Sequence, residues 1–98
     1  MSYDLILRSK RILNKDELTF IGNNIKVYAE MLGGELLSTK TEPLGVGERL
    51  GTIVFSNDPW DAEQAAINQL LNAIKRFDLS LHDPQTGESI NNHWRRLN

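Results

Sequence analysis

The feature that most constrains the fold is the alternation of two amphipathic helical patterns with short apolar runs within 98 residues. The first helical pattern begins at Asn14, and Glu17 follows at the spacing of a capping box. It ends at the glycine pair Gly33 and Gly34. Apolar residues recur within it every three or four positions, which predicts a buried stripe made of Leu18, Ile21, Ile25, Tyr28 and Leu32.

The second helical pattern follows Asp58, which we expect to cap it. Pro59 is tolerated in a first helical turn, and Asp61 is favoured there by the helix dipole. Lys75 and Arg76 match the dipole at the other end. The predicted buried stripe consists of Trp60, Ile67, Leu70, Ile74 and Phe77, with Ala66 and Leu71 beside it.

The apolar runs predict strands at residues 3–8, 35–41, 52–55 and 79–82, of which 35–41 is the most polar and is expected at a sheet edge. The resulting order is strand, helix, strand, strand, helix, strand. This order predicts an α+β fold of the ferredoxin-like split βαβ type, with two helices on one face of an antiparallel sheet. We expect one globular domain over residues 1–98, with residues 91–98 as a packed tail.

A turn is predicted after the last of these strands, in the stretch Asp83-Pro84-Gln85-Thr86-Gly87. Proline after the first residue of a turn and glycine at its exit are typical of a tight reversal. Residues 88–90 are then expected to return as a short fifth strand, which completes a C-terminal hairpin.

Composition excludes several classes of site. The chain has no cysteine, so disulfides and thiolate chemistry are absent, and we expect a cytoplasmic protein. Its N-terminal residues lack the charge order of a secretory signal, and no apolar run approaches the roughly 20 residues that span a bilayer, so no membrane contact is expected. The net charge of -2 argues against general binding of a nucleic-acid backbone.

The predicted topology separates charged residues into two ends of the domain. One end should collect carboxylates beside Trp60, namely Asp58, Asp61, Glu63, Asp83 and Glu88. The other should be basic, with Lys10, Arg11, Lys15, Lys40, Arg49, Lys75 and Arg76 among several acids. Helix capping and ordinary solvated surface would explain this distribution. The functional alternative is an acidic docking end for a basic protein.

Catalytic and metal-binding patterns are weak, so we expect no enzyme, no metal and no cofactor. Asp4, Ser80 and His82 should share the helix-free face of the sheet, but the two-residue spacing predicts that Ser80 and His82 are too far apart for a direct hydrogen bond. The same face should carry Ile6, Thr52 and Val54, without the aromatic platform that stacks RNA bases. Trp94 in the tail is expected either to cover the sheet or to anchor a partner.

Two resemblances can be stated. The segments "YDLIL", "GGEL" and "GERLGTIVF" resemble the layout of the ferredoxin-like small-subunit ribosomal protein, which implies an RNA-associated or ribosome-associated binding domain. The segment "FDLSLHDPQTGESI" is similar to the terminal strand and turn of small bacterial toxin-immunity proteins, including those for contact-dependent growth inhibition toxins. This second resemblance implies an immunity protein that occludes the active site of a cognate toxin, typically a basic nuclease domain. The sequence leaves the oligomeric state open.

Overall fold

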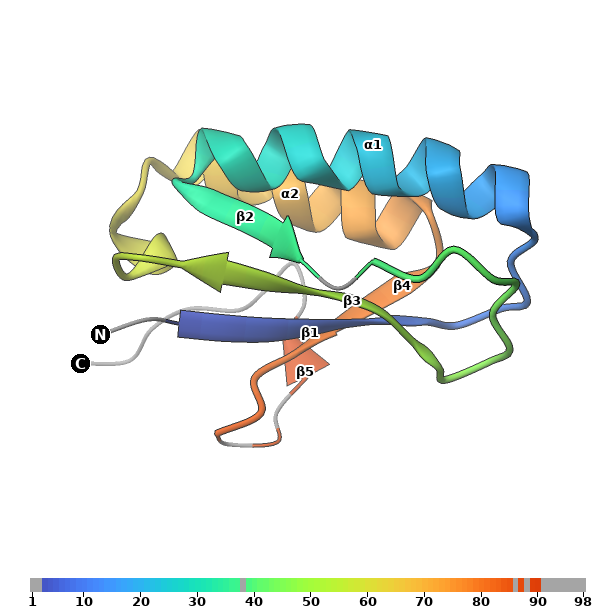
Figure 1. Cartoon of the computed structure of the whole chain (residues 1–98). Helices are drawn as coiled ribbons and strands as arrows, with labels where there is room; N and C mark the ends of the chain where they lie inside the picture. Colours follow the sequence, from blue (N-terminus) through green and yellow to red (C-terminus); the bar gives the residue numbers. More distant parts are fainter. Residues whose placement is uncertain (1–2, 38, 86, 88, 91–98) are drawn as a thin grey trace.

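The computed structural model describes residues 3–37, 39–85, 87 and 89–90. Two α-helices lie side by side on one face of an antiparallel sheet (Figure 1). The sheet order is β2-β3-β1-β4-β5, so β1 is central and β2 and β5 form the edges. The elements are β1 (Tyr3–Ser9), α1 (Lys15–Met31), β2 (Gly34–Leu37), β3 (Arg49–Phe55), the 3₁₀ helix η1 (Pro59–Asp61), α2 (Gln64–Arg76), β4 (Leu79–His82) and β5 (Ser89–Ile90).

This architecture confirms the predicted α+β class, and its strand order is compatible with a ferredoxin-like arrangement. The short fifth strand is also confirmed, because Leu81 and His82 pair with Ile90 and Ser89. No helix within the described ranges is long and apolar enough to cross a membrane. Residues 91–98, where the sequence predicts a packed tail with Trp94, lie outside the described residues.

Helix α1 begins as its sequence predicts. The Glu17 amide donates to Asn14 Oδ1 at 2.8 Å, and the Asn14 amide donates to Glu17 Oε1 at 3.1 Å, which completes the capping box. The helix ends at Met31, after which Leu32 caps it and Gly33 adopts φ +77°. A positive φ of this size is readily available to glycine, so the chain can turn directly into β2.

The second strand is shorter than the predicted 35–41 and ends at Leu37. Further along, the chain turns back over the entrance to α1. Leu44 and Leu13 exchange two backbone hydrogen bonds of 2.9 and 3.0 Å, and both side chains are buried. Before it reaches Leu44 the segment still contacts β3, because the Lys40 amide donates a hydrogen bond to the Leu50 carbonyl at 2.9 Å. The regular pairing of β2 with β3 nevertheless ends at Leu37.

The third strand begins at Arg49, three residues before the predicted start, because it contains a β-bulge. Leu7 pairs with Gly51, whereas Arg8 pairs with Arg49, which leaves Leu50 as the extra residue. Leu50 is fully buried in the core, and Arg49 is exposed next to Arg8.

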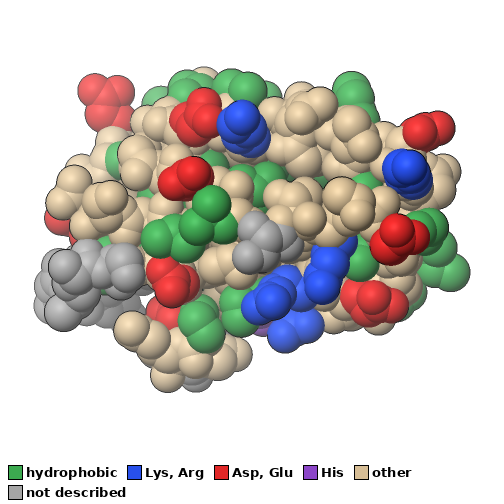
Figure 2. All heavy atoms as spheres, viewed as in Figure 1, with side chains coloured by type: hydrophobic (Ala, Val, Ile, Leu, Met, Phe, Trp, Pro, Cys, Tyr) green, Lys and Arg blue, Asp and Glu red, His purple; other side chains and the backbone are tan. Residues whose placement is uncertain are grey.

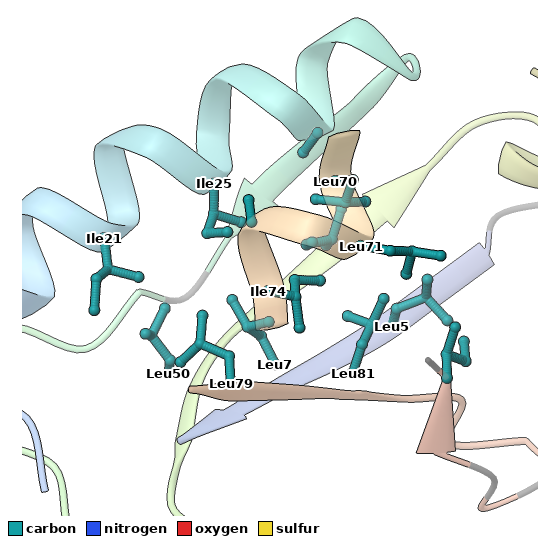
Figure 3. Close-up of a cluster of buried hydrophobic side chains, with 14 of the residues drawn as sticks. Leu5, Leu7, Ile21, Ile25, Leu50, Leu70, Leu71, Ile74, Leu79 and Leu81 are labelled. Atoms are coloured by element: carbon teal, nitrogen blue, oxygen red, sulfur yellow. The ribbon is translucent and has the colours of Figure 1, made fainter. Parts of the chain in front are cut away.

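The core lies between the two helices and the sheet. Figure 3 shows Leu71 and Ile74 of α2 beside the leucines of β1 and β4, and Leu70 of the same helix is fully buried. Burial of each such side chain contributes roughly 1.5–3 kcal/mol. The sheet residues labelled in that cluster are Leu5, Leu7, Leu50, Leu79 and Leu81. The partly buried Trp60 and Phe77 pack at the periphery of this core.

Candidate partner-binding site

The connection between β3 and α2 folds as a separate turn and not as the first turn of α2. Asp58 has extended backbone angles, and its Oδ1 accepts a hydrogen bond from the Trp60 amide at 2.9 Å. The prediction that Asp58 caps the second helix is therefore wrong: Asp58 caps η1. Ala62 is extended at φ -72° and ψ 169°, which interrupts the helical path. Helix α2 starts two residues later, with Glu63 at the N-cap position and no side-chain cap bond.

A small, shallow cleft of about 20 Å³ joins η1 to the start of β1 and to the turn after β4. Half-buried Trp60 lies in it with two carboxylates, Asp4 and Asp83. The cleft is lined by Tyr3, Asp4, Leu5, Pro59, Trp60, Asp83 and Gln85. Two further predicted site residues are exposed: Asp61, the last residue of η1, and Glu63, at the N-cap position of α2. Glu88 lies outside the described residues.

The turn after β4 uses Asp83 structurally. Asp83 Oδ1 accepts a hydrogen bond from the Gln85 amide at 2.9 Å, and the Asp83 carbonyl accepts one from the Gly87 amide at 2.7 Å. Gly87 has φ +73°, as the exit of the turn requires. Asp83 therefore stabilises the hairpin as well as lining the cleft, so replacing it would disturb both the turn and any contact made there.

The predicted basic end is divided in the structure. Arg11 Nη1 lies 2.7 Å from Glu17 Oε2, and Arg11 Nε lies 3.3 Å from Asp78 Oδ2. The hydrogen bond from Arg11 is the main cause that lowers the pKa of Glu17, and the bond to the Asn14 amide adds to it. Arg76 stacks over the Phe77 ring at 4.7 Å from its centroid.

Two of the predicted basic residues, Lys15 and Lys40, line a different site, a groove of about 530 Å³ between α1 and β2. Lys26, Glu30 and Glu35 line the same groove, so it contains both signs of charge. Figure 2 shows how the two ends of the molecule differ in charge. Toward the left end of the view the charged side chains are acidic, whereas the right-hand half mixes Lys and Arg with Asp and Glu. The described residues thus form no purely basic end.

The helix-free face corrects one geometric expectation. Ser80 Oγ and His82 Nε2 lie 2.9 Å apart and form a hydrogen bond, although their spacing predicts that they do not. Side chains two residues apart on one face of a strand can lean toward each other, which strand rise alone does not describe. Within the described ranges His82 makes no hydrogen bond to a carboxylate, so the pair lacks the third group that orients a catalytic base.

Metal ligation has no support in the part of the chain that the structure describes. Among those residues, no group of three or more histidine, cysteine, aspartate or glutamate side chains could hold a metal ion.

Five residues that line the cleft are absent from the predicted site: Tyr3, Asp4, Leu5, Pro59 and Gln85. The sequence places Asp4 only on the open sheet face, where it is exposed and pairs in register with Val54. The topology could have indicated that Asp4 lies near the cleft, because β1 starts at the end of the sheet where β3 and β4 finish.

Comparison of the chain with protein-family models, curated protein sequences and solved structures finds no match.

Proposed function

We propose that the chain is a ferredoxin-like binding protein that neutralises a basic protein partner by occlusion, as an immunity protein does with the nuclease domain of its cognate toxin. The observation that carries this proposal is the cleft at the η1 end, where half-buried Trp60 lies with Asp4 and Asp83. Exposed Asp61 and Glu63 follow Trp60 within three residues. An aromatic side chain surrounded by carboxylates suits a surface that is rich in lysine and arginine.

The physical roles of these residues differ. Carboxylates occupy the positions that phosphates would take on a nuclease, and their field speeds the encounter with a basic active site. Only part of the Trp60 ring is exposed, because the ring also packs against the core, and its backbone is fixed by the Asp58 cap, so little conformational entropy is lost when the exposed part makes a contact. Occlusion by this surface needs no chemistry from the chain.

The first experiment is affinity purification of the tagged chain from an extract of its source cells, with and without nuclease treatment. A basic protein retained at near one-to-one stoichiometry after nuclease treatment supports the proposal. Ribosomal RNA or ribosomal proteins that are lost on treatment would instead favour an RNA-associated domain. That outcome would move attention to the mixed groove with Lys15, Lys26 and Lys40.

The second experiment measures association kinetics with the retained protein. The variant Asp61→Asn/Glu63→Gln removes two exposed charges without changing side-chain size, and Glu42→Gln/Glu48→Gln is the matched control on the connection before β3. We expect the first variant to lower the association rate at low salt, within the roughly 10- to 1,000-fold range of electrostatic steering, and the difference to shrink at high salt. Equal association rates for both variants would refute a role for the η1 end.

A further inference from the structure

The sheet face opposite the helices is ordered in three rows across the strands. Neither α-helix lies on this face (Figure 1). Strand pairing aligns Glu35, Val54 and Asp4 in one row and Leu37, Thr52, Ile6 and His82 in the next. The third row contains Arg49, Arg8 and Ser80. The face is therefore acidic at one end and basic at the other, and its middle row combines the aliphatic Leu37 and Ile6 with Thr52 and His82.

Three aliphatic side chains lie on this face: Leu37 and Ile6 in the middle row, and Val54 beside Asp4 in the acidic row. Leu37 is 40 % exposed, and Ile6, Thr52 and Val54 are half-buried. Aliphatic residues in the centre with charged residues at both rims are the anatomy of a protein interface. The bulge at Leu50 contributes to this arrangement, because it places Arg49 beside Arg8 on the rim.

The charge order is self-complementary under only one of two possible two-fold axes lying in the plane of contact. An axis parallel to the strands would place each end of the face over the same end of a second copy, so that like charges meet. An axis across the strands, along the row of Thr52 and Ile6, places the acidic end of each copy over the basic end of the other. Isologous contact then pairs Asp4 with Arg8 of the second copy, and the reverse pair forms by symmetry.

We propose that the helix-free sheet face pairs with the same face of a second copy of this chain, about a two-fold axis that crosses the strands. Ile6 and Thr52 lie on the axis and pack against their own counterparts. Arg8 donates one hydrogen bond to the Gly47 carbonyl at 3.0 Å, and a guanidinium has five N–H donors, so Arg8 can also bind a carboxylate.

The size of the face sets the expected strength of this contact. Four strands about 4.8 Å apart, each covering about five residues on the face, give a flat area of roughly 300 Å² per copy. Stable interfaces typically bury about 800 Å² per partner. We therefore expect a reversible dimer whose population depends on protein concentration, rather than an obligate one.

Sedimentation velocity of the full chain over a range of concentrations tests the proposal first. We expect the wild-type chain to shift from monomer to dimer as concentration rises. Ile6→Glu should weaken dimerisation by at least about tenfold, because it places two carboxylates on the axis. Val27→Glu is the matched control, because Val27 is 55 % exposed on α1. A chain that stays monomeric at all concentrations, or one equally affected by both substitutions, would overturn the proposal.

Charge exchange tests the axis and does not depend on the apolar centre. Asp4→Arg should weaken the dimer because the introduced guanidinium then faces Arg8 of the second copy, and the double variant Asp4→Arg/Arg8→Asp should restore it. An axis parallel to the strands keeps Asp4 over the acidic end of the second copy and away from Arg8, so it predicts neither the loss on Asp4→Arg nor the recovery in the double variant. Failure of the double variant to restore the dimer, with unchanged circular dichroism, would refute the proposed axis. Asp4 also lines the cleft at η1, so Asp4→Arg changes both sites, whereas Asp61→Asn changes only the partner site and should leave dimerisation unchanged.

Discussion

Substitution of Gly34 by alanine is expected to destabilise the domain through one steric contact. Gly34 is the first residue of β2, and an added Cβ would lie 2.5 and 2.6 Å from two ring carbons of Phe55, as well as 3.2 Å from the Ala29 carbonyl oxygen. Phe55 is fully buried, so its ring has little room to move away. Overpacking of this kind costs roughly 1–3 kcal/mol.

The cost can be converted into a melting temperature. For a domain of this size, 1 kcal/mol corresponds to about 4–8 °C, so a cost of about 2 kcal/mol lowers Tm by roughly 8–16 °C. Thermal and urea unfolding followed by circular dichroism measure both quantities. Gly33→Ala is the matched control, because nothing lies within 4 Å of its added Cβ and only its φ of +77° is unfavourable. We expect the control to cost about 1 kcal/mol.

A double-mutant cycle identifies the cause. Phe55→Leu removes the ring that Gly34→Ala would strike, so the two substitutions together should cost less than the sum of the single effects. Gly33→Ala should be additive with Phe55→Leu. The reasoning is refuted if Gly34→Ala is neutral, or if its cost is the same with and without the Phe55 ring.

The other predictions concern the capping box, the bulge and pH. Asn14→Ala should lower the free energy of unfolding by about 1 kcal/mol through loss of the cap, whereas an unchanged urea midpoint would contradict the capping role. Leu50→Ala should lower the free energy of unfolding by about 2–5 kcal/mol because Leu50 is fully buried. Val46→Ala, at a site 68 % exposed, is the control and should cost far less. Similar urea midpoints for the two variants would argue against burial of Leu50 in the bulge. Because folding lowers the pKa of Glu17, its ionised form stabilises the fold above the unfolded pKa of about 4.3, and this contribution is lost as pH falls through the folded value. The stability difference between wild type and Glu17→Gln should therefore shrink below about pH 4, and a constant difference down to about pH 2 would count against this assignment.

The site shows where sequence reasoning succeeds and fails. Topology predicted that Trp60 and Asp83 would lie at one end, and they line one cleft. The role of Asp58 was mistaken because Asp-Pro at a helix start is also compatible with a separate 3₁₀ turn, and the extended Ala62 decides between the two. The Ser80–His82 contact was missed because a spacing along a strand does not fix how side chains lean.

Sequence by itself determined the elements with strong local signals. The capping box of Asn14 and Glu17, the apolar stripes of both helices and the order of the strands depend on neighbours within a few residues, so their patterns are readable along the chain. The tertiary structure alone decided the bulge at Leu50, the early end of β2, and the ion pairs that join Arg11 to Glu17 and Asp78. These features depend on residues far apart in sequence competing for the same space or charge, and no local pattern records which contact prevails.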